Sequence, residues 1–209
     1  RDVMAMLRET YEGTDFDMTK NILTWRPEAK DHPADTVKSP IANPWLTTTE
    51  LRTLNTIAPE SVEFRRTVAV SWCAYSHVTQ LRNWLPDEVG GICWFSVDNP
   101  GQSPRIPIFC GTTELPESFS ICGQKTYNPD CILWQFRRAN RLATIQWQST
   151  KDGFNEKILK HEENAVNGIP QAAVSPAVLN AYTEYVYDQA VETWKEMEGE
   201  YWVKFWAGF

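Results

Sequence analysis

Cysteine is scarce in this sequence, and its spacing does not suit a metal. The five cysteines include no CxxC pair, so neither a structural metal site nor a cofactor is expected. They are odd in number, and four lie in or beside apolar runs, where small buried thiols are usual. Free thiols favour a reducing, cytoplasmic setting over an exported one, although any export signal would lie upstream. The five are Cys73, Cys93, Cys110, Cys122 and Cys131.

A basic stripe and a long apolar run are also absent. With 27 acidic and 20 basic residues the net charge is -7, and the densest basic cluster, Arg137–Arg141, is typical of a solvated helix face. Nucleic acid is therefore not an expected partner. No run approaches the roughly 20 apolar residues of a membrane span, and the first residues do not form a signal peptide. We therefore expect no membrane partner.

What the sequence does contain suits a globular fold. Its 209 residues, 42% of them hydrophobic, suffice for one domain with a substantial core. The 10 tryptophans suit packed layers or an apolar cleft, and core packing is the commoner use.

The stretch from Ser71 to Pro107 contains the main predicted strands and most of the candidate site residues. In the segment that leads into it, Val62–Trp72, apolar and polar residues alternate, which predicts a half-buried strand. The continuous apolar run Ile92–Val97 predicts a buried strand. Gly90-Gly91, just before that run, allows a turn or a close backbone approach.

Residues that favour a turn follow the buried run Ile92–Val97. Asp98-Asn99-Pro100-Gly101 predicts a turn, with Gly101 as the residue free to adopt a positive φ. The next apolar run, Pro104–Cys110, is interrupted by a proline and predicts at best an edge strand.

The N-terminal part predicts a helix followed by a long arm. Asp2 can cap a first helix, and Glu12–Thr19 predicts a turn whose two aspartates either cap the backbone or bind a cation, with capping favoured. The proline-rich segment Ile22–Pro59 predicts an irregular covering loop. It contains one short helix over Thr47–Asn55, capped by Thr48 or Thr49.

The C-terminal third predicts three helices. They begin near Cys131, at Thr150 and at Pro176, and Ser175 caps the third, which is expected to end near Gly199. Strands and helices are segregated rather than alternating, so the fold class predicted is α+β.

We interpret residues 1–209 as a single piece of one larger domain. It comprises a helix and covering arm (1–61), a strand region (62–110) and a helical part (131–209). The chain opens at Arg1, without an initiator methionine and directly on a capped helix. This start suggests a piece of a longer polypeptide.

Candidate site residues cluster after the first predicted strand. Ser76 and His77 are adjacent in a strand and should point to opposite faces, and Cys73 lies about 13 Å from His77 along an extended chain, so no catalytic triad is predicted. Arg82 requires an acceptor, either a nearby acid such as Asp87 or an anionic end of a substrate. Asn99 is either a turn residue or a site residue, with the turn favoured.

Three motifs occur together in a fixed order. They are YEGTDFDMT at Tyr11–Thr19, SHVTQLRNWLPDEVGG at Ser76–Gly91, and WFSVDNP at Trp94–Pro100 with IPIFCG at Ile106–Gly111. In this combination the chain resembles the dipeptidase A family, which are cysteine dipeptidases of the N-terminal-nucleophile hydrolase superfamily. The resemblance runs from about residue 2 to residue 134 and is most specific in the first two motifs.

The resemblance implies a four-layer αββα sandwich and the hydrolysis of dipeptides. The nucleophile in that superfamily is the first residue of the mature chain, and its own α-amine, with a pKa of about 8, acts as the base. It further implies an oxyanion site built from backbone N–H groups and a polar side chain. By the same analogy an arginine near the nucleophile helps to hold the cysteine, and Arg82 is the candidate.

The chain departs from this pattern at its first residue, which is Arg1 and not cysteine. We therefore expect the C-terminal half of such an enzyme, with the nucleophile in the missing N-terminal half, which would be its main partner besides the dipeptide. Ser76, His77 and Asn99 are expected to line the cleft. Half a sandwich leaves a sheet face uncovered, so the isolated chain is expected to be poorly soluble or to form homo-oligomers. The alternatives are a related amidase acting on N-acyl amides and a non-catalytic binding relative.

Overall fold

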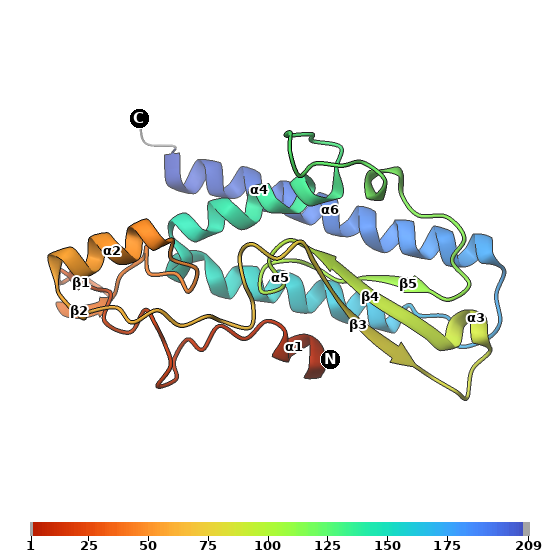
Figure 1. Ribbon diagram of the computed structural model, residues 1–209, viewed down its shortest axis with the longest axis horizontal. Helices are drawn as coiled ribbons and strands as arrows, with labels where there is room; N and C mark the ends of the chain where they lie inside the picture. The colour runs from red at the N-terminus through yellow and green to blue at the C-terminus, as the bar shows by residue number, and fades with distance from the viewer. Residues whose placement is uncertain (1, 207–209) are drawn as a thin grey trace.

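Helices form the C-terminal third of the structure, and antiparallel strands precede them (Figure 1). The computed structural model describes residues 2–206. The predicted α+β class is confirmed. In chain order the elements are α1 (Asp2–Met6), β1 (Leu23–Arg26), β2 (Asp35–Lys38), α2 (Thr48–Ile57), β3 (Tyr75–Leu81), α3 (Asp87–Gly90), β4 (Gly91–Val97), β5 (Ile106–Phe109), the 3-10 turn η1 (Glu117–Phe119), α4 (Ile132–Ile145), α5 (Trp147–Asn167) and α6 (Pro176–Trp206).

The main sheet has the strand order β3-β4-β5, and both pairings are antiparallel. Tyr75 lies opposite Val97, and Leu81 lies opposite Gly91. The close approach predicted for the glycine pair is confirmed, because a Cβ added to Gly91 would lie 2.3 Å from Cys110 Sγ. A side chain at Gly91 would therefore push apart β4 and the end of β5.

The strand predicted over residues 62–72 is wrong. In this segment the chain forms no ladder, and β3 begins only at Tyr75. Burial does not follow the alternation either, since polar Thr67 is buried and bonds the Ala69 carbonyl while apolar Val68 and Trp72 are 45% and 60% exposed. Alternation indicates an extended backbone, but it does not supply a neighbouring strand with which to pair.

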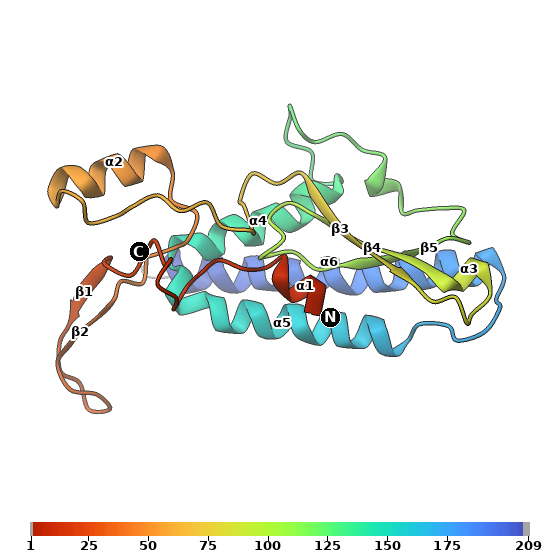
Figure 2. The ribbon, with the colours of Figure 1, turned by 60° about the horizontal axis from the view of Figure 1, so that its bottom comes forward.

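The arm predicted over residues 22–59 has more structure than expected. It contains the β1–β2 hairpin as well as α2, and both lie at the end of the molecule remote from α3 (Figure 2). Thr47 caps α2, one residue before the predicted caps. Its side chain accepts from Glu50 N while the Glu50 carboxylate accepts from Thr47 N, which is a complete capping box.

Long helices carry most of the core. The helix expected from Thr150 begins at Trp147, and the one expected to end near Gly199 continues to Trp206. Phe136 and Phe154 each meet Trp194 edge to face, with ring centroids 5.7 Å apart, a geometry favoured by the ring quadrupoles. Within residues 2–206, no helix combines the length and the apolar character that a membrane span requires.

The YEGTDFDMT turn is organised by the buried carboxylate of Asp17. One oxygen accepts from the Thr19 backbone and hydroxyl at 2.8 and 2.7 Å, and the other accepts from Gly13 N at 3.0 Å and Lys38 Nζ at 2.8 Å. The carboxylate is thus fully used by protein donors, as the capping interpretation of this turn requires.

Asp17 should make the stability of this segment depend on pH. Burial acts to raise its pKa, but the bonds from Lys38, Thr19 and Gly13 outweigh it and lower the pKa from 3.8 to about 2. A carboxyl whose pKa is lower in the folded state stabilises the fold above its unfolded pKa, and this contribution is lost as the pH falls toward 2. We expect Asp17→Asn to cost about 1–2 kcal/mol in unfolding free energy near neutral pH.

Urea unfolding between about pH 6 and about pH 3 measures this difference, which should shrink toward the acid end. Asp15→Asn in the same turn is the control, because its side chain is exposed. A cost that does not change with pH would contradict the assignment.

Candidate functional site

The β3–β4 hairpin has one buried face and one exposed face. Ile92 and Trp94 lie on the buried face, each 1% exposed. Residues directly opposite in an antiparallel pair share a face, and His77 is opposite Phe95 while Thr79 is opposite Cys93. We call this second side the exposed sheet face; it consists of Tyr75, His77, Thr79, Leu81, Cys93 and Phe95.

Aromatic rings cover one end of the exposed sheet face. Tyr75 stacks on His77 and on Phe95, with ring centroids 6.4 and 5.7 Å apart. Phe95 in turn meets Phe119 of η1 at 5.9 Å. Beside these rings lies a mainly apolar hollow of about 320 Å³, and Ala74, Val97, Ile121, Cys131 and Leu133 also line it. The volume and apolar lining of this hollow are within the range of small-molecule binding sites.

Of the predicted cleft residues, only His77 lies on the exposed sheet face. Ser76 is on the other face, opposite Ser96, so the prediction that Ser76 and His77 point apart is confirmed. Both serine hydroxyls are buried and have no hydrogen-bond partner among the described residues. No side-chain hydrogen bond in the described part of the chain joins Ser76 to His77 or to Asn99.

Arg82 is buried just beyond the end of β3. Its Nη2 donates to the Val89 carbonyl, while its Nε is buried without a partner among residues 2–206. Burial lowers the pKa of this guanidinium. The predicted ion pair with Asp87 does not occur among the described salt bridges, and the guanidinium instead holds the α3 turn. Its role toward a substrate or a nucleophile stays a prediction.

Asn99 is fully engaged within its turn. Its Oδ1 accepts from Gly101 N at 3.0 Å and its Nδ2 donates to Gln102 Oε1 at 2.9 Å. Gly101 does not use its freedom to adopt a positive φ, and in this turn Asp98 has φ +64° instead. Aspartate tolerates this conformation better than most residues, since its short side chain bonds locally.

The carboxylate of Asp98 anchors a buried polar network that sequence reasoning missed. Its Oδ1 accepts from Arg137 Nε at 2.8 Å and Nη2 at 2.6 Å, and its Oδ2 accepts from Asn140 Nδ2 at 2.9 Å. Asn140 also donates to Ser103 Oγ at 2.9 Å and accepts from Trp194 Nε1 at 2.9 Å. The two residues that bond Asp98 directly are 39 and 42 positions further along the chain, in the Arg137–Arg141 cluster that the sequence suggested was a solvated helix face.

A second buried charge cluster was also missed. Arg105, with no exposed surface, donates to Glu162 Oε1 at 3.1 Å, and Arg8 donates to the same oxygen at 2.7 Å. Arg105 Nε and Nη2 have no partner among the described residues. Burial lowers the pKa of Arg105, although the nearby Glu162 opposes this shift.

Two thiols near the β3–β4 hairpin, those of Cys73 and Cys93, are poorly suited to nucleophilic attack. Burial raises the pKa of both Cys73 and Cys93, which reduces the thiolate fraction at neutral pH. The Cys73 thiol donates to the Tyr75 carbonyl at 3.1 Å, and no cysteine within residues 2–206 bonds a histidine or an amine. The described residues also contain no group of three histidine, cysteine or acidic side chains placed to hold a metal ion.

Comparison with known proteins shows that this chain is similar to peptidases. A family model described as Peptidase family C69 matches residues 1–160. This match covers well over half of the chain, which therefore belongs to peptidase family C69. The family resemblance carried by the three motifs is confirmed.

A curated relative agrees with this assignment. The chain is 24% identical over 118 residues to a protein from Latilactobacillus sakei named "Probable dipeptidase". The aligned part covers 48% of this chain but 25% of the relative, so the chain spans about a quarter of the length of the relative that it matches.

Removal of the Asp98 charge should destabilise the fold strongly. Asparagine keeps the tolerance for a positive φ but leaves Arg137 without its carboxylate, so Asp98→Asn should cost about 2–4 kcal/mol in unfolding free energy. Asp98→Ala should cost about 1 kcal/mol more, because alanine resists this backbone conformation. Denaturant unfolding measures both values.

The matched control is Asp152→Asn on α5, whose exposed side chain should allow a change within about 0.5 kcal/mol. If Asp98→Asn proved as mild as this control, the network could not be what fixes the end of β4.

Proposed function

We propose that this chain is part of a cysteine dipeptidase of the N-terminal-nucleophile type. The nucleophilic thiol belongs to polypeptide outside these 209 residues, and the exposed sheet face forms one wall of the cleft. Membership of peptidase family C69 is the observation that carries the proposal. The relative named as a probable dipeptidase supports the substrate class.

The exposed sheet face is evidence that a second layer, formed by polypeptide outside this chain, covers it. Tyr75 and Leu81 are 59% and 76% exposed on a strand whose other face is packed. Large apolar side chains on a regular sheet face commonly mark a surface that another element covers. In an αββα sandwich that element is the second sheet, so the β3–β4 hairpin would lie at the interface between the two sheets.

The proposed chemistry needs a thiol beside a base, and no cysteine of the described residues bonds a histidine or an amine. An N-terminal cysteine supplies both, because its α-amine has a pKa of about 8 and can accept the thiol proton near neutral pH. The thiolate attacks the peptide carbonyl, the C–N bond breaks to release the second amino acid, and water then hydrolyses the thioester. The raised pKa values of Cys73 and Cys93 support a nucleophile located elsewhere.

Two alternatives follow from the same fold. One is an amidase acting on N-acyl amides, and the other is a non-catalytic binding relative. Neither is favoured by a particular contact in the structure. Activity of the complete polypeptide on a panel of dipeptides and N-acyl amino acids distinguishes the three.

Activity should require the upstream polypeptide. We expect no dipeptide hydrolysis by the 209 residues alone, and hydrolysis when they are produced together with the polypeptide that precedes them. Replacement of the N-terminal cysteine of the mature enzyme by alanine should lower kcat by several orders of magnitude. Sequencing of the mature N-terminus, with the rate of dipeptide cleavage, tests this. Hydrolysis by the purified 209 residues would refute the proposal.

His77 should act on substrate binding and not on stability. Because its side chain is exposed and stacks only on Tyr75, we expect His77→Asn in the complete enzyme to raise KM for dipeptides about threefold to tenfold, with kcat and melting temperature nearly unchanged. Steady-state kinetics and a thermal melt measure this. His32→Asn, in the loop between β1 and β2, is the control. If KM is unchanged in both variants, His77 does not take part in substrate binding in the cleft.

A further inference from the structure

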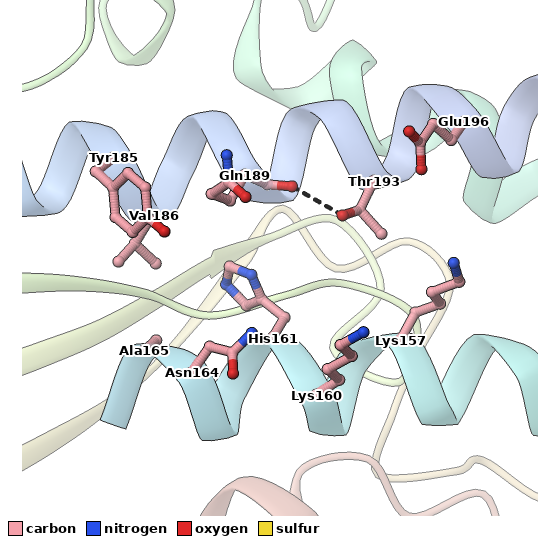
Figure 3. A pocket seen from close by; sticks show the side chains of 10 residues that line it. All are labelled: Lys157, Lys160, His161, Asn164, Ala165, Tyr185, Val186, Gln189, Thr193 and Glu196. Atoms are coloured by element: carbon pink, nitrogen blue, oxygen red, sulfur yellow. Dashed lines mark hydrogen bonds between the residues drawn. The ribbon is translucent and has the colours of Figure 1, made fainter. Parts of the chain in front are cut away.

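A polar groove lies between α5 and α6 (Figure 3), and none of its lining residues belongs to the exposed sheet face. It encloses about 260 Å³, enough for a small ligand and several waters. From α5 it receives Lys157, Lys160, His161 and Asn164, which share a helix face because they are spaced by three and four residues. From α6 it receives Tyr185, Val186, Gln189, Thr193 and Glu196.

His161 is the most buried polar group of the groove and points toward α6 (Figure 3). Its side chain is 9% exposed, and its Nε2 lies 3.2 Å from the Arg105 carbonyl. A carbonyl only accepts, so Nε2 carries the proton and donates. The other ring nitrogen, Nδ1, has no partner among the described residues.

The two lysines of the groove carry charges without partners. Lys157 and Lys160 make no ion pair or hydrogen bond within residues 2–206, whereas Lys38 and Lys151 both pair with Glu12. Glu196 is the single carboxylate of the lining. The groove therefore has a net charge of about +1 with His161 neutral, in a chain whose net charge is -7.

We propose that this groove binds a small oxyanion, either a phosphate or a carboxylate group, between Lys157, Lys160 and His161. The ammonium groups supply charge-assisted hydrogen bonds. Asn164 and Gln189 supply amide donors at the edge of the same hollow. His161 donates through Nδ1 once that nitrogen is protonated. The site stands independently of the proposed peptidase activity.

Binding should be coupled to protonation of His161. Burial lowers its pKa, while the bond to the Arg105 carbonyl and the charge of Glu162 act in the other direction. The imidazole is then mainly neutral at neutral pH, and an oxyanion binds more tightly to the protonated form. Affinity should therefore rise as the pH falls, by at most about tenfold per pH unit for one proton. The charged and titratable groups around His161 are Lys157, Lys160 and Glu162 on α5, Tyr185 and Glu196 on α6, and Arg105 before β5.

Calorimetric titration of the complete polypeptide with inorganic phosphate, and separately with acetate, tests the proposal at constant ionic strength. We expect saturable binding of at least one of the two anions. Lys160→Gln should weaken it about fivefold, and Glu196→Gln should strengthen it about threefold by removing a like charge. The matched control is Lys195→Gln, which removes an equal charge from α6 outside the groove.

Each outcome decides the matter. Binding of phosphate alone, or of acetate alone, supports the site and identifies the class of oxyanion. Absence of saturable binding with both anions overturns the proposal. Equal weakening of binding by Lys195→Gln and Lys160→Gln also overturns it, because it would show that the anion is attracted by the overall charge of the protein and not by the groove. Binding that stays constant between about pH 7 and about pH 5, after the anion's own protonation is taken into account, would overturn the part assigned to His161, because burial lowers the pKa of this imidazole from 6.5.

Discussion

The carboxylate of Asp98 is the constraint on which the rest of the structure depends. It lies at the end of β4, where the chain must turn, and it binds two residues of α4. Asn140, one of these two, accepts from Trp194 of α6, so a single buried group connects the sheet to two helices. A buried carboxylate is costly unless every acceptor is used. Here the charge of Arg137 and the amide of Asn140 meet that requirement.

The network also explains why the turn after β4 has its particular geometry. Asp98 adopts a positive φ, Asn99 donates to the Gln102 side chain, and Gln102 donates to the Asn140 carbonyl. Strain of this kind persists only where the surroundings fix the backbone by several contacts. In a family of peptidases it is natural to assign such a turn to catalysis. The hydrogen bonds instead show that the amide of Asn99 is used in holding the turn.

Much of the fold was predictable, because local signals fix the helices and the buried strand. Pro176 after Ser175 set the start of the longest helix, and the run Ile92–Val97 set β4. The failures came where pairing decides structure. Residues 62–72 alternate like a strand but have no neighbouring strand to pair with. The residues Leu23–Arg26 carry no strong strand pattern, yet they form a strand because they pair with Asp35–Lys38. Of the site, the opposite orientations of Ser76 and His77 followed from strand geometry alone. The partners of Asp98 and Arg105 lie on distant helices and could not be predicted.

Arg105 links the N-terminal segment to the groove between α5 and α6. Its guanidinium, through Glu162, is tied to Arg8 just beyond α1, while its backbone carbonyl orients His161 toward the groove between α5 and α6. Any shift of the N-terminal segment would act on Glu162, which neighbours His161 on α5, and on the residue that fixes the imidazole. Since buried ion clusters resist partial rearrangement, the groove and the N-terminal segment should hold their relative positions or change them together. The carboxylate of Glu162, which binds Arg8 just after α1 to the helices, therefore also supports the groove proposed to bind an oxyanion.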